Sequence, residues 1–295
     1  MITLRLLFLL LVTFAAEGKT TITWLQTDWP PHQIVSGPFQ GQGTFDLIQQ
    51  QIAAKLPQFN HQTRLVNLAR LEQAFLQQDP AICALGTLYS EQRAKTRLFS
   101  TPVAVGPALA VGYIAGRLTS HPAMVSDGAD IQKLALDRTL TGAYQPNRYY
   151  PPVIMVLLQH PDTNLVKHAF TSEINAAALL AGKRVDYVVE YPERMQYYNQ
   201  LLEQPVALEH QAIRGADIAS ISYVTCSTDV AGQSVITSLN QLLPALWQQQ
   251  EYLQAIQTWL DDSARQRLGT ELAKLQQQAL MQLQTWPHDT VNTGH

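Results

Sequence analysis

Apolar residues recur along the chain with two different periods, which predict strands and helices in alternation. Residues 19–26 alternate β-branched and aromatic side chains with other residues, which is typical of a strand. After a glycine-rich turn, the apolar residues of 44–56 recur at helical spacing. Repeated units of this kind indicate an α/β fold with a mostly parallel sheet. The same criteria predict strands at 63–66, 81–85, 139–144 and 185–189, and helices at 67–77, 150–159, 173–181, 232–249, 251–260 and 263–285.

Two further segments, 102–114 and 219–226, are apolar and extended. We expect each of them to be a strand that crosses between two lobes. The predicted fold class is therefore α/β, with two lobes and two hinge crossings. These crossings divide the chain into a first lobe (19–106), a second lobe (107–220), a helical return to the first lobe (221–285) and a frayed tail (286–295).

The first eighteen residues (1–18) have the features of a secretory signal peptide. Arg5 is followed by an apolar stretch up to Ala16 and then by small residues. The apolar stretch is too short to span a bilayer. No cysteine follows the expected cleavage site, so we expect a free periplasmic protein without a lipid anchor.

Composition and charge argue against several classes of function. The net charge is −3 and no basic run occurs, which argues against nucleic acid or an anionic membrane surface as a partner. The eight histidines show no metal-binding spacing, and no G-x-S-x-G motif occurs. We therefore expect no metal, no cofactor and no enzymatic activity. The chain is also expected to be a monomer.

The two cysteines, Cys83 and Cys226, both lie in apolar, strand-like segments. In an oxidising compartment they could form a disulfide, but buried free thiols are equally natural in such segments. The sequence leaves both alternatives open.

Three motifs occur along the chain in a recognisable order. They are Ser90-Glu91-Gln92-Arg93 followed by Phe99-Ser100-Thr101-Pro102, then residues 182–186, and then residues 240–243. They resemble the T-x-x-R … F-S-x-P segment, the G-R-x-D motif and part of the C-terminal helix of the type II periplasmic solute-binding proteins of the amino-acid-binding class, extracellular solute-binding protein family 3. The resemblance covers nearly the whole mature chain and implies the two-lobed fold.

The resemblance assigns a carboxylate-binding role to Arg93, because the family's arginine holds the ligand's carboxylate with its planar guanidinium. Ser90 stands at the family's threonine position and is expected to cap the following helical turn, which presents N–H groups to an anion. The alternative is an exposed arginine in a short surface helix.

The family also carries an aromatic plate after its first strand, and this place corresponds to Trp29. A rigid aromatic ring can cover an aliphatic or cationic part of a ligand. Trp29 could instead cover the end of the sheet. Asp28 beside it is a candidate partner for an ammonium group, or an aspartate that shapes the turn.

Two positions depart from the family pattern. Leu88 stands where the family often has a hydroxyl, and a leucine cannot donate to a carboxylate. In the family, an acidic residue of the second lobe binds the α-ammonium group of the ligand. The corresponding position here is Tyr191, and Glu190 lies one residue earlier. Because successive side chains of a strand point to opposite faces of the sheet, a shift of one residue directs the side chain to the other face, unless the strand ends before it. Glu190 remains a candidate because Pro192 follows it closely.

Two further ligand-binding candidates come from helix and loop positions. Arg70 opens the predicted helix 67–77, and helix starts after strands lie at the sheet edge where such folds bind ligands. It could equally be an exposed helix arginine. The loop 142–150 takes the place of a ligand-gripping loop in the family, and Tyr144 is its candidate. Its tyrosines could instead cover the edge of the lobe.

The resemblance implies that the chain binds a small polar solute, amino-acid-like or carboxylated, and delivers it to an ABC permease of the inner membrane. One alternative is a soluble sensor for a membrane receptor or signalling protein, since both use closure of two lobes about a hinge. A second is a periplasmic hydro-lyase, because a few proteins of this fold act on carboxylated rings. A chain that binds nothing and serves as a scaffold is a third.

Overall fold

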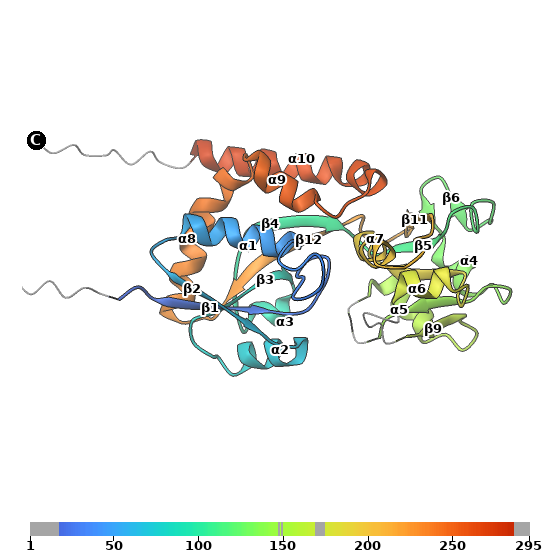
Figure 1. The fold of residues 1–295 in the computed structure, drawn as a ribbon, viewed down its shortest axis with the longest axis horizontal. Coiled ribbons are helices and arrows are strands. Elements are labelled where there is room, and N and C mark those ends of the chain that lie inside the picture. The colour runs from blue at the N-terminus through green and yellow to red at the C-terminus, as the bar shows by residue number, and fades with distance from the viewer. Residues whose placement is uncertain (1–17, 147, 149, 169–174, 286–295) are drawn as a thin grey trace, which may run out of the picture.

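The computed structural model describes residues 18–146, 148, 150–168 and 175–285. Within them the chain forms two lobes that lie side by side, each built around one five-stranded sheet (Figure 1). Residues 1–17 of the predicted leader, the predicted tail and the start of the predicted helix at 173 lie outside the described residues. None of the described helices combines the length and the apolar character that crossing a membrane requires.

The first lobe has a sheet with strand order β2-β1-β3-β12-β4. Successive residues of β1 are buried on opposite faces. Trp24 joins the core formed with α1 and α8, whereas Leu25 packs with Leu71 and Phe75 of α2. Helices therefore cover both faces. The elements of this lobe are β1 (Thr21–Gln26), α1 (Thr44–Lys55), β2 (Asn60–Leu65), α2 (Leu68–Leu76), β3 (Ile82–Leu88), α3 (Glu91–Ala94), β4 (Leu98–Pro107), β12 (Ala219–Cys226), α8 (Val230–Leu246), α9 (Gln250–Gln257) and α10 (Asp262–Thr285).

The second lobe has a sheet with strand order β11-β5-β10-β8-β9. Its strand β10 is buried on both faces, with Tyr187 and Val189 in one core cluster and Val188 in another. The elements of this lobe are β5 (Ala110–Ile114), β6 (Met124–Val125), β7 (Gly128–Ala129), α4 (Ile131–Ala135), β8 (Gly142–Tyr144), α5 (Pro152–Leu158), β9 (Leu165–Lys167), α6 (Ala176–Ala181), β10 (Tyr187–Glu190), α7 (Pro192–Gln200) and β11 (Leu208–Ala212).

Two chain crossings connect the lobes and lie next to each other. The first runs from the end of β4 at Pro107 to the start of β5 at Ala110, and the second leads into β12 at Ala219. The Ala108 N–H donates to the Ile218 carbonyl at 3.1 Å, which ties the crossings together. The extended segments predicted from the sequence are thus the strands at the junction of the two lobes.

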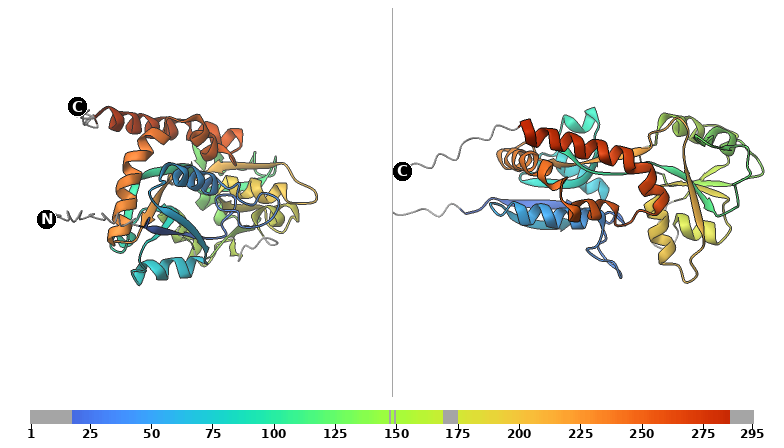
Figure 2. Two further views of the ribbon diagram at one scale, coloured as in Figure 1. Left: turned by 60° about the vertical axis from the view of Figure 1, so that its left-hand side comes forward. Right: turned by 90° about the horizontal axis from the view of Figure 1, so that it is seen from above.

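The C-terminal helices belong to the first lobe, but the beginning of α10 reaches the second (Figure 2). Asp261, just before α10, accepts a hydrogen bond from His210 of β11 at 2.8 Å and another from Gln196 of α7 at 3.1 Å. Arg267 of α10 contacts the other ring nitrogen of His210 at 2.9 Å. The lobes are therefore held together at a second place besides the crossings.

The sequence-based expectation of a mostly parallel sheet is wrong. In the first lobe β1 pairs in parallel with β2 and β3, but β12 is antiparallel to both β3 and β4. The second sheet is mixed as well, because β5 is antiparallel to β10 and β11. The return strand comes from the other lobe, so no crossover helix forces it to run parallel. The helix α7 and the strand β11 were not predicted, since both are polar in sequence.

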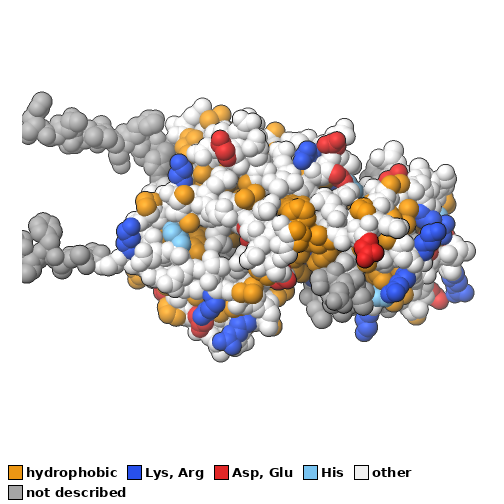
Figure 3. All heavy atoms as spheres, viewed as in Figure 1, with side chains coloured by type: hydrophobic (Ala, Val, Ile, Leu, Met, Phe, Trp, Pro, Cys, Tyr) orange, Lys and Arg blue, Asp and Glu red, His pale blue; other side chains and the backbone are white. Residues whose placement is uncertain are grey.

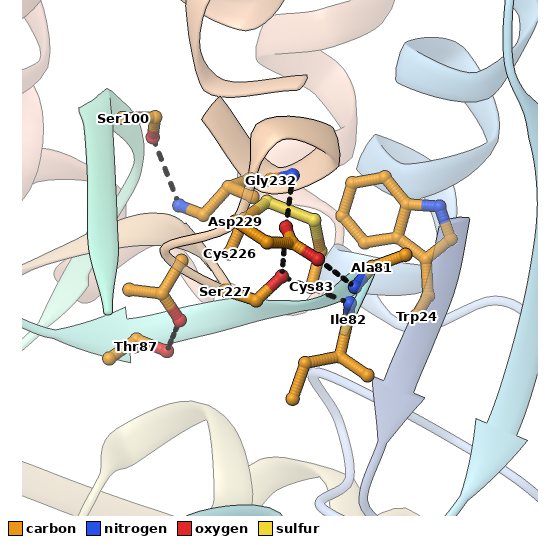
Figure 4. The surroundings of a disulfide bond; sticks show 12 residues. Trp24, Ala81, Ile82, Cys83, Thr87, Ser100, Cys226, Ser227, Asp229 and Gly232 are labelled. Atoms are coloured by element: carbon orange, nitrogen blue, oxygen red, sulfur yellow. Dashed lines mark hydrogen bonds between the residues drawn. A yellow bond between two sulfur atoms is a disulfide. The ribbon is translucent and has the colours of Figure 1, made fainter. Parts of the chain in front are cut away.

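A disulfide joins β3 and β12 in the core of the first lobe (Figure 4). Cys83 and Cys226 lie opposite each other in register, both are fully buried, and their sulfurs are 2.03 Å apart. The two cysteines are therefore paired in a disulfide and are not free thiols, which the sequence leaves open. Nearby, Asp229 accepts hydrogen bonds from the N–H groups of Ala81 and Gly232, at 2.8 and 2.7 Å, and so fixes the start of α8 to the start of β3.

Removing the disulfide should destabilise the whole protein. The bond links residues 143 positions apart, with the entire second lobe between them, so it restricts the unfolded chain strongly. We expect the variant with both Cys83→Ala and Cys226→Ala to lose about 2–5 kcal/mol of unfolding free energy. Urea denaturation of oxidised and reduced wild type provides the control. An equal midpoint for oxidised protein, reduced protein and variant would contradict this role.

Candidate functional site

A cleft of about 950 Å³ lies between the lobes, with walls from both of them and from the crossing at 105–107. Figure 3 shows hydrophobic side chains gathered where the two halves meet. The first lobe contributes the loop after β1, the end of β3 and the start of α2. The second lobe contributes the loop after β8 and the start of α7. Its volume is in the range of small-molecule sites.

The loop after β1 is shaped by a buried carboxylate. Asp46 of α1 accepts hydrogen bonds from the N–H groups of Ile34 and Gly43 and from the side chain of Gln26. Burial raises the pKa of Asp46, although these hydrogen bonds act in the opposite direction. The loop is thereby held against α1, which directs Trp29 and His32 into the cleft.

The first-lobe wall contains an arginine that is already paired. Arg93 donates to Glu72 of α2 at 3.1 Å and to the Leu88 carbonyl at 3.1 Å. The other carboxylate oxygen of Glu72 accepts from Arg97, which is 2% exposed and lies over the Phe75 ring. Burial lowers the pKa of Arg97 and Glu72 opposes this effect. A single carboxylate of the chain itself therefore bridges two arginines.

Behind the second-lobe wall lies a buried charge cluster. Glu190, at the end of β10, is 1% exposed and accepts from Arg148 at 2.6 Å, with Arg194 at 3.7 Å. Burial alone would raise the pKa of Glu190, but the two arginines and the Tyr191 N–H hold it below its usual value. The carboxylate is thus ionised and enclosed, and it does not line the cleft.

Two side chains of α7 make contacts that cross directly from lobe to lobe at the cleft. Arg194 of α7 donates to the Pro30 carbonyl at 2.7 Å and places its guanidinium 4.1 Å from the centroid of the Trp29 ring. Next to it, Glu193 lies 3.3 Å from Nε2 of His32. These contacts join the start of α7 to the loop after β1, so the cleft is closed at this end.

The structure places only some of the predicted ligand-binding residues on the cleft. Trp29, Asp28 and Arg93 line it, as the sequence analysis expects, although their role with a ligand stays a prediction. Ser90 acts as the expected cap, because its hydroxyl accepts from the Arg93 N–H at 3.2 Å. Ser90 itself does not line the cleft, and neither do the remaining three: Arg70 is exposed, Tyr144 packs against Tyr150, and Glu190 is buried in its ion pairs.

Sequence reasoning missed several charged and polar residues of the cleft. Glu72, His32 and Glu193 line it and carried no motif. Gln145 and Arg148 line it from the loop 142–150, which the resemblance did single out, whereas its residues Asn147 and Tyr149 lie outside the described residues. The one available signal for Glu193 was its place directly after Pro192, since proline favours the first turn of a helix.

Comparisons with known proteins identify the fold. No protein-family model and no curated protein matches the sequence. Among solved structures, a probable amino-acid ABC transporter extracellular-binding protein from Bacillus subtilis has a TM-score of 0.61 at 13% identity, over 83% of this chain and 100% of the other. The chain has the two-lobed fold of type II periplasmic binding proteins.

Two other structures with this periplasmic-binding fold represent different uses of it. An amino acid ABC transporter substrate-binding protein from Streptococcus pneumoniae, bound to L-arginine, has a TM-score of 0.56 at 16% identity, over 81% of this chain and 93% of the other. A histidine kinase sensor domain with similarity to periplasmic binding proteins has a TM-score of 0.57 at 17% identity, over 82% and 96%. Among the described residues of this chain, no group of three or more His, Cys, Asp or Glu is placed to hold a metal ion.

Neutralising the buried carboxylate of the second lobe should be costly. In Glu190→Gln, two buried arginines lose their counter-charge, so we expect a loss of about 3–5 kcal/mol of unfolding free energy at pH 7. Because the folded pKa of Glu190 lies below its usual value, its contribution is present at neutral pH and disappears as the pH falls through that lowered pKa. The difference between wild type and variant should therefore shrink in acid. Denaturation at a series of pH values measures this, with the exposed Glu203→Gln as control. A difference that does not depend on pH would contradict the assignment.

Proposed function

We propose that this protein is a periplasmic binding protein that takes up a small solute in the cleft between its lobes and presents it to an ABC permease in the inner membrane. The observation that carries the proposal is the cleft itself, whose walls come from both lobes and from the crossing that joins them. A ligand that contacts both walls favours the closed arrangement of the lobes.

The proposed binding sequence begins on the first lobe. The solute docks against Trp29 and the wall that contains Arg93, and the second lobe then closes over it. Closure removes water from the cleft, which strengthens each polar contact that the ligand makes there. The contacts of Arg194 with Pro30 and Trp29 complete the closed state.

A sensor role is the second candidate, and one comparison favours it. The histidine kinase sensor domain has the same fold, so a membrane receptor could equally recognise the closed, ligand-bound form of this protein. We propose no enzymatic activity. Among the described residues of the cleft, Glu72, Arg93 and Arg148 are engaged in ion pairs. Glu193 contacts His32 across the two lobes. If a ligand is recovered chemically unchanged after incubation, the hydro-lyase alternative is excluded for it.

The identity of the solute is best found by examining the purified protein. Mass spectrometry of the extract after mild denaturation should reveal a co-purifying small molecule. Adding that molecule back should raise the melting temperature in proportion to the logarithm of its concentration above Kd. If no molecule co-purifies and no solute from a broad screen stabilises the protein, the binding proposal is wrong.

Replacing the cleft arginine should remove stabilisation by any solute whose carboxylate Arg93 holds. Arg93→Ala takes a cation out of the first-lobe wall and leaves Glu72 with one arginine instead of two. For a carboxylated solute we expect the shift in melting temperature to disappear, whereas a solute that is only a cation should keep it. Arg70→Ala is the matched control, because Arg70 is exposed and outside the cleft. An unchanged shift for a carboxylated solute in Arg93→Ala, or an equal loss in Arg70→Ala, would remove Arg93 from the site.

A further inference from the structure

We propose that the solute is an organic amine with an apolar body, and that its ammonium group is received by Glu193 of the second lobe together with His32 of the first. A carboxylate on the ligand is not required, since Glu72 already holds Arg93. This inference rests on the proposed function and specifies the ligand of that same cleft.

The cleft has buried polar side-chain atoms that no protein group satisfies. Among its described lining residues, the buried side-chain atoms without a partner are Oε2 of Glu193, Oε1 of Gln145 and Nδ1 of His32. Glu193 is 2% exposed, and its other oxygen contacts Nε2 of His32 at 3.3 Å. When that nitrogen donates to Glu193, Nδ1 is left as an acceptor.

Glu193 carries the argument because an ionised carboxylate can only accept. An unpartnered, buried carboxylate oxygen is costly and is satisfied by a ligand that brings donors and positive charge. A primary ammonium offers three N–H donors in a compact cation.

The cationic side chains of the cleft, in contrast, already have partners. Each nitrogen of the Arg148 guanidinium donates to the protein: to Tyr150, to Glu190 and to the Val189 carbonyl, at 2.9, 2.6 and 2.8 Å. Arg93 donates to Glu72 and to the Leu88 carbonyl. An anionic ligand would have to share the Arg93 guanidinium with Glu72, a carboxylate that remains attached to the chain and at high local concentration.

The rest of the lining matches an apolar ligand body. Aromatic rings of both lobes line the cleft, among them Trp29, Phe45 and Tyr191. At the mouth, Leu65 and Leu68 line the cleft while remaining 58% and 51% exposed. Apolar surface of this kind gains free energy when a ligand covers it. Aromatic faces also attract an organic cation.

The arrangement links amine binding to closure. Glu193 comes from α7 and His32 from the loop after β1, so a group that binds between them contacts both lobes at once. One residue further along α7, Arg194 makes the contacts to Pro30 and Trp29. An ammonium at Glu193 therefore stabilises the same end of α7 that closes the cleft.

Three probes that share a phenyl body separate the possible charges: phenethylamine as the amine, phenylacetate as the acid and phenylalanine as both. On ligand-free wild-type protein, we expect calorimetry and thermal shift to detect phenethylamine and not phenylacetate. Phenylalanine should bind no more tightly than phenethylamine. This comparison uses no variant, so it is independent of any effect of mutation on folding.

Glu193→Gln should weaken phenethylamine binding roughly 30-fold or more, since it removes the charge of a buried hydrogen-bonded pair. Glu203→Gln, an exposed change of the same kind in the same lobe, should leave the affinity unchanged. Stronger binding of phenylacetate or phenylalanine than of phenethylamine would overturn the amine inference, as would wild-type affinity in Glu193→Gln.

The outcomes also separate this inference from the proposed function. If a co-purifying solute stabilises the protein but is an acid, solute binding stands and the amine assignment fails. If neither a co-purifying solute nor any probe stabilises it, both fail.

Discussion

The first-lobe side of the cleft depends on the position of β12 between β3 and β4. This strand returns from the second lobe, so its pairing joins segments of the chain that lie far apart in sequence. The disulfide from Cys226 to Cys83 and the hydrogen bonds of Asp229 hold its end in register with β3. Because β3 and the crossing after β4 both line the cleft, the shape of the site follows from this one pairing.

A second constraint is that charges removed from water must be paired. The chain meets it with its own residues at two places: Glu72 between Arg93 and Arg97, and Glu190 between Arg148 and Arg194. Both clusters leave the walls polar and preorganised, and they engage donors of Arg93 and Arg148, the two arginines among the described residues that line the cleft. Nε and Nη1 of Arg97 and Nε of Arg194, which lie outside the cleft lining, have no hydrogen-bond partner. The carboxylate of Glu193, which has only one oxygen paired, is therefore the group that distinguishes this cleft.

Much of the fold could be predicted from the sequence because apolar periodicity reports burial. The helices α1 and α8 carry their buried residues at helical spacing, and the strands β1 and β12 lie in segments rich in apolar residues. The predicted ranges of all four overlap closely with those in the structure. Strand direction could not be predicted, since a strand reads alike in either direction. The helix α7 was missed because Glu193, Arg194 and Asn199 are buried there in spite of their polarity. Periodicity gives no signal for polar residues that are buried through pairing.

Only those features of the candidate site that depend on short segments of sequence could be predicted. The cap formed by Ser90 and the cleft positions of Trp29 and Arg93 follow from short segments, and the structure agrees with them. The partner of Arg93 did not follow, since Glu72 lies on another element 21 residues away. The position of Tyr191 shows the same limit. Where a strand would have placed an acid, the chain turns into α7, and the first helical turn brings Glu193 to the cleft instead. The carboxylate that faces the cleft therefore lies in the first turn of the helix and not at the end of the strand. A comparison of aligned positions does not detect such a change, because it assumes the same backbone conformation at each position.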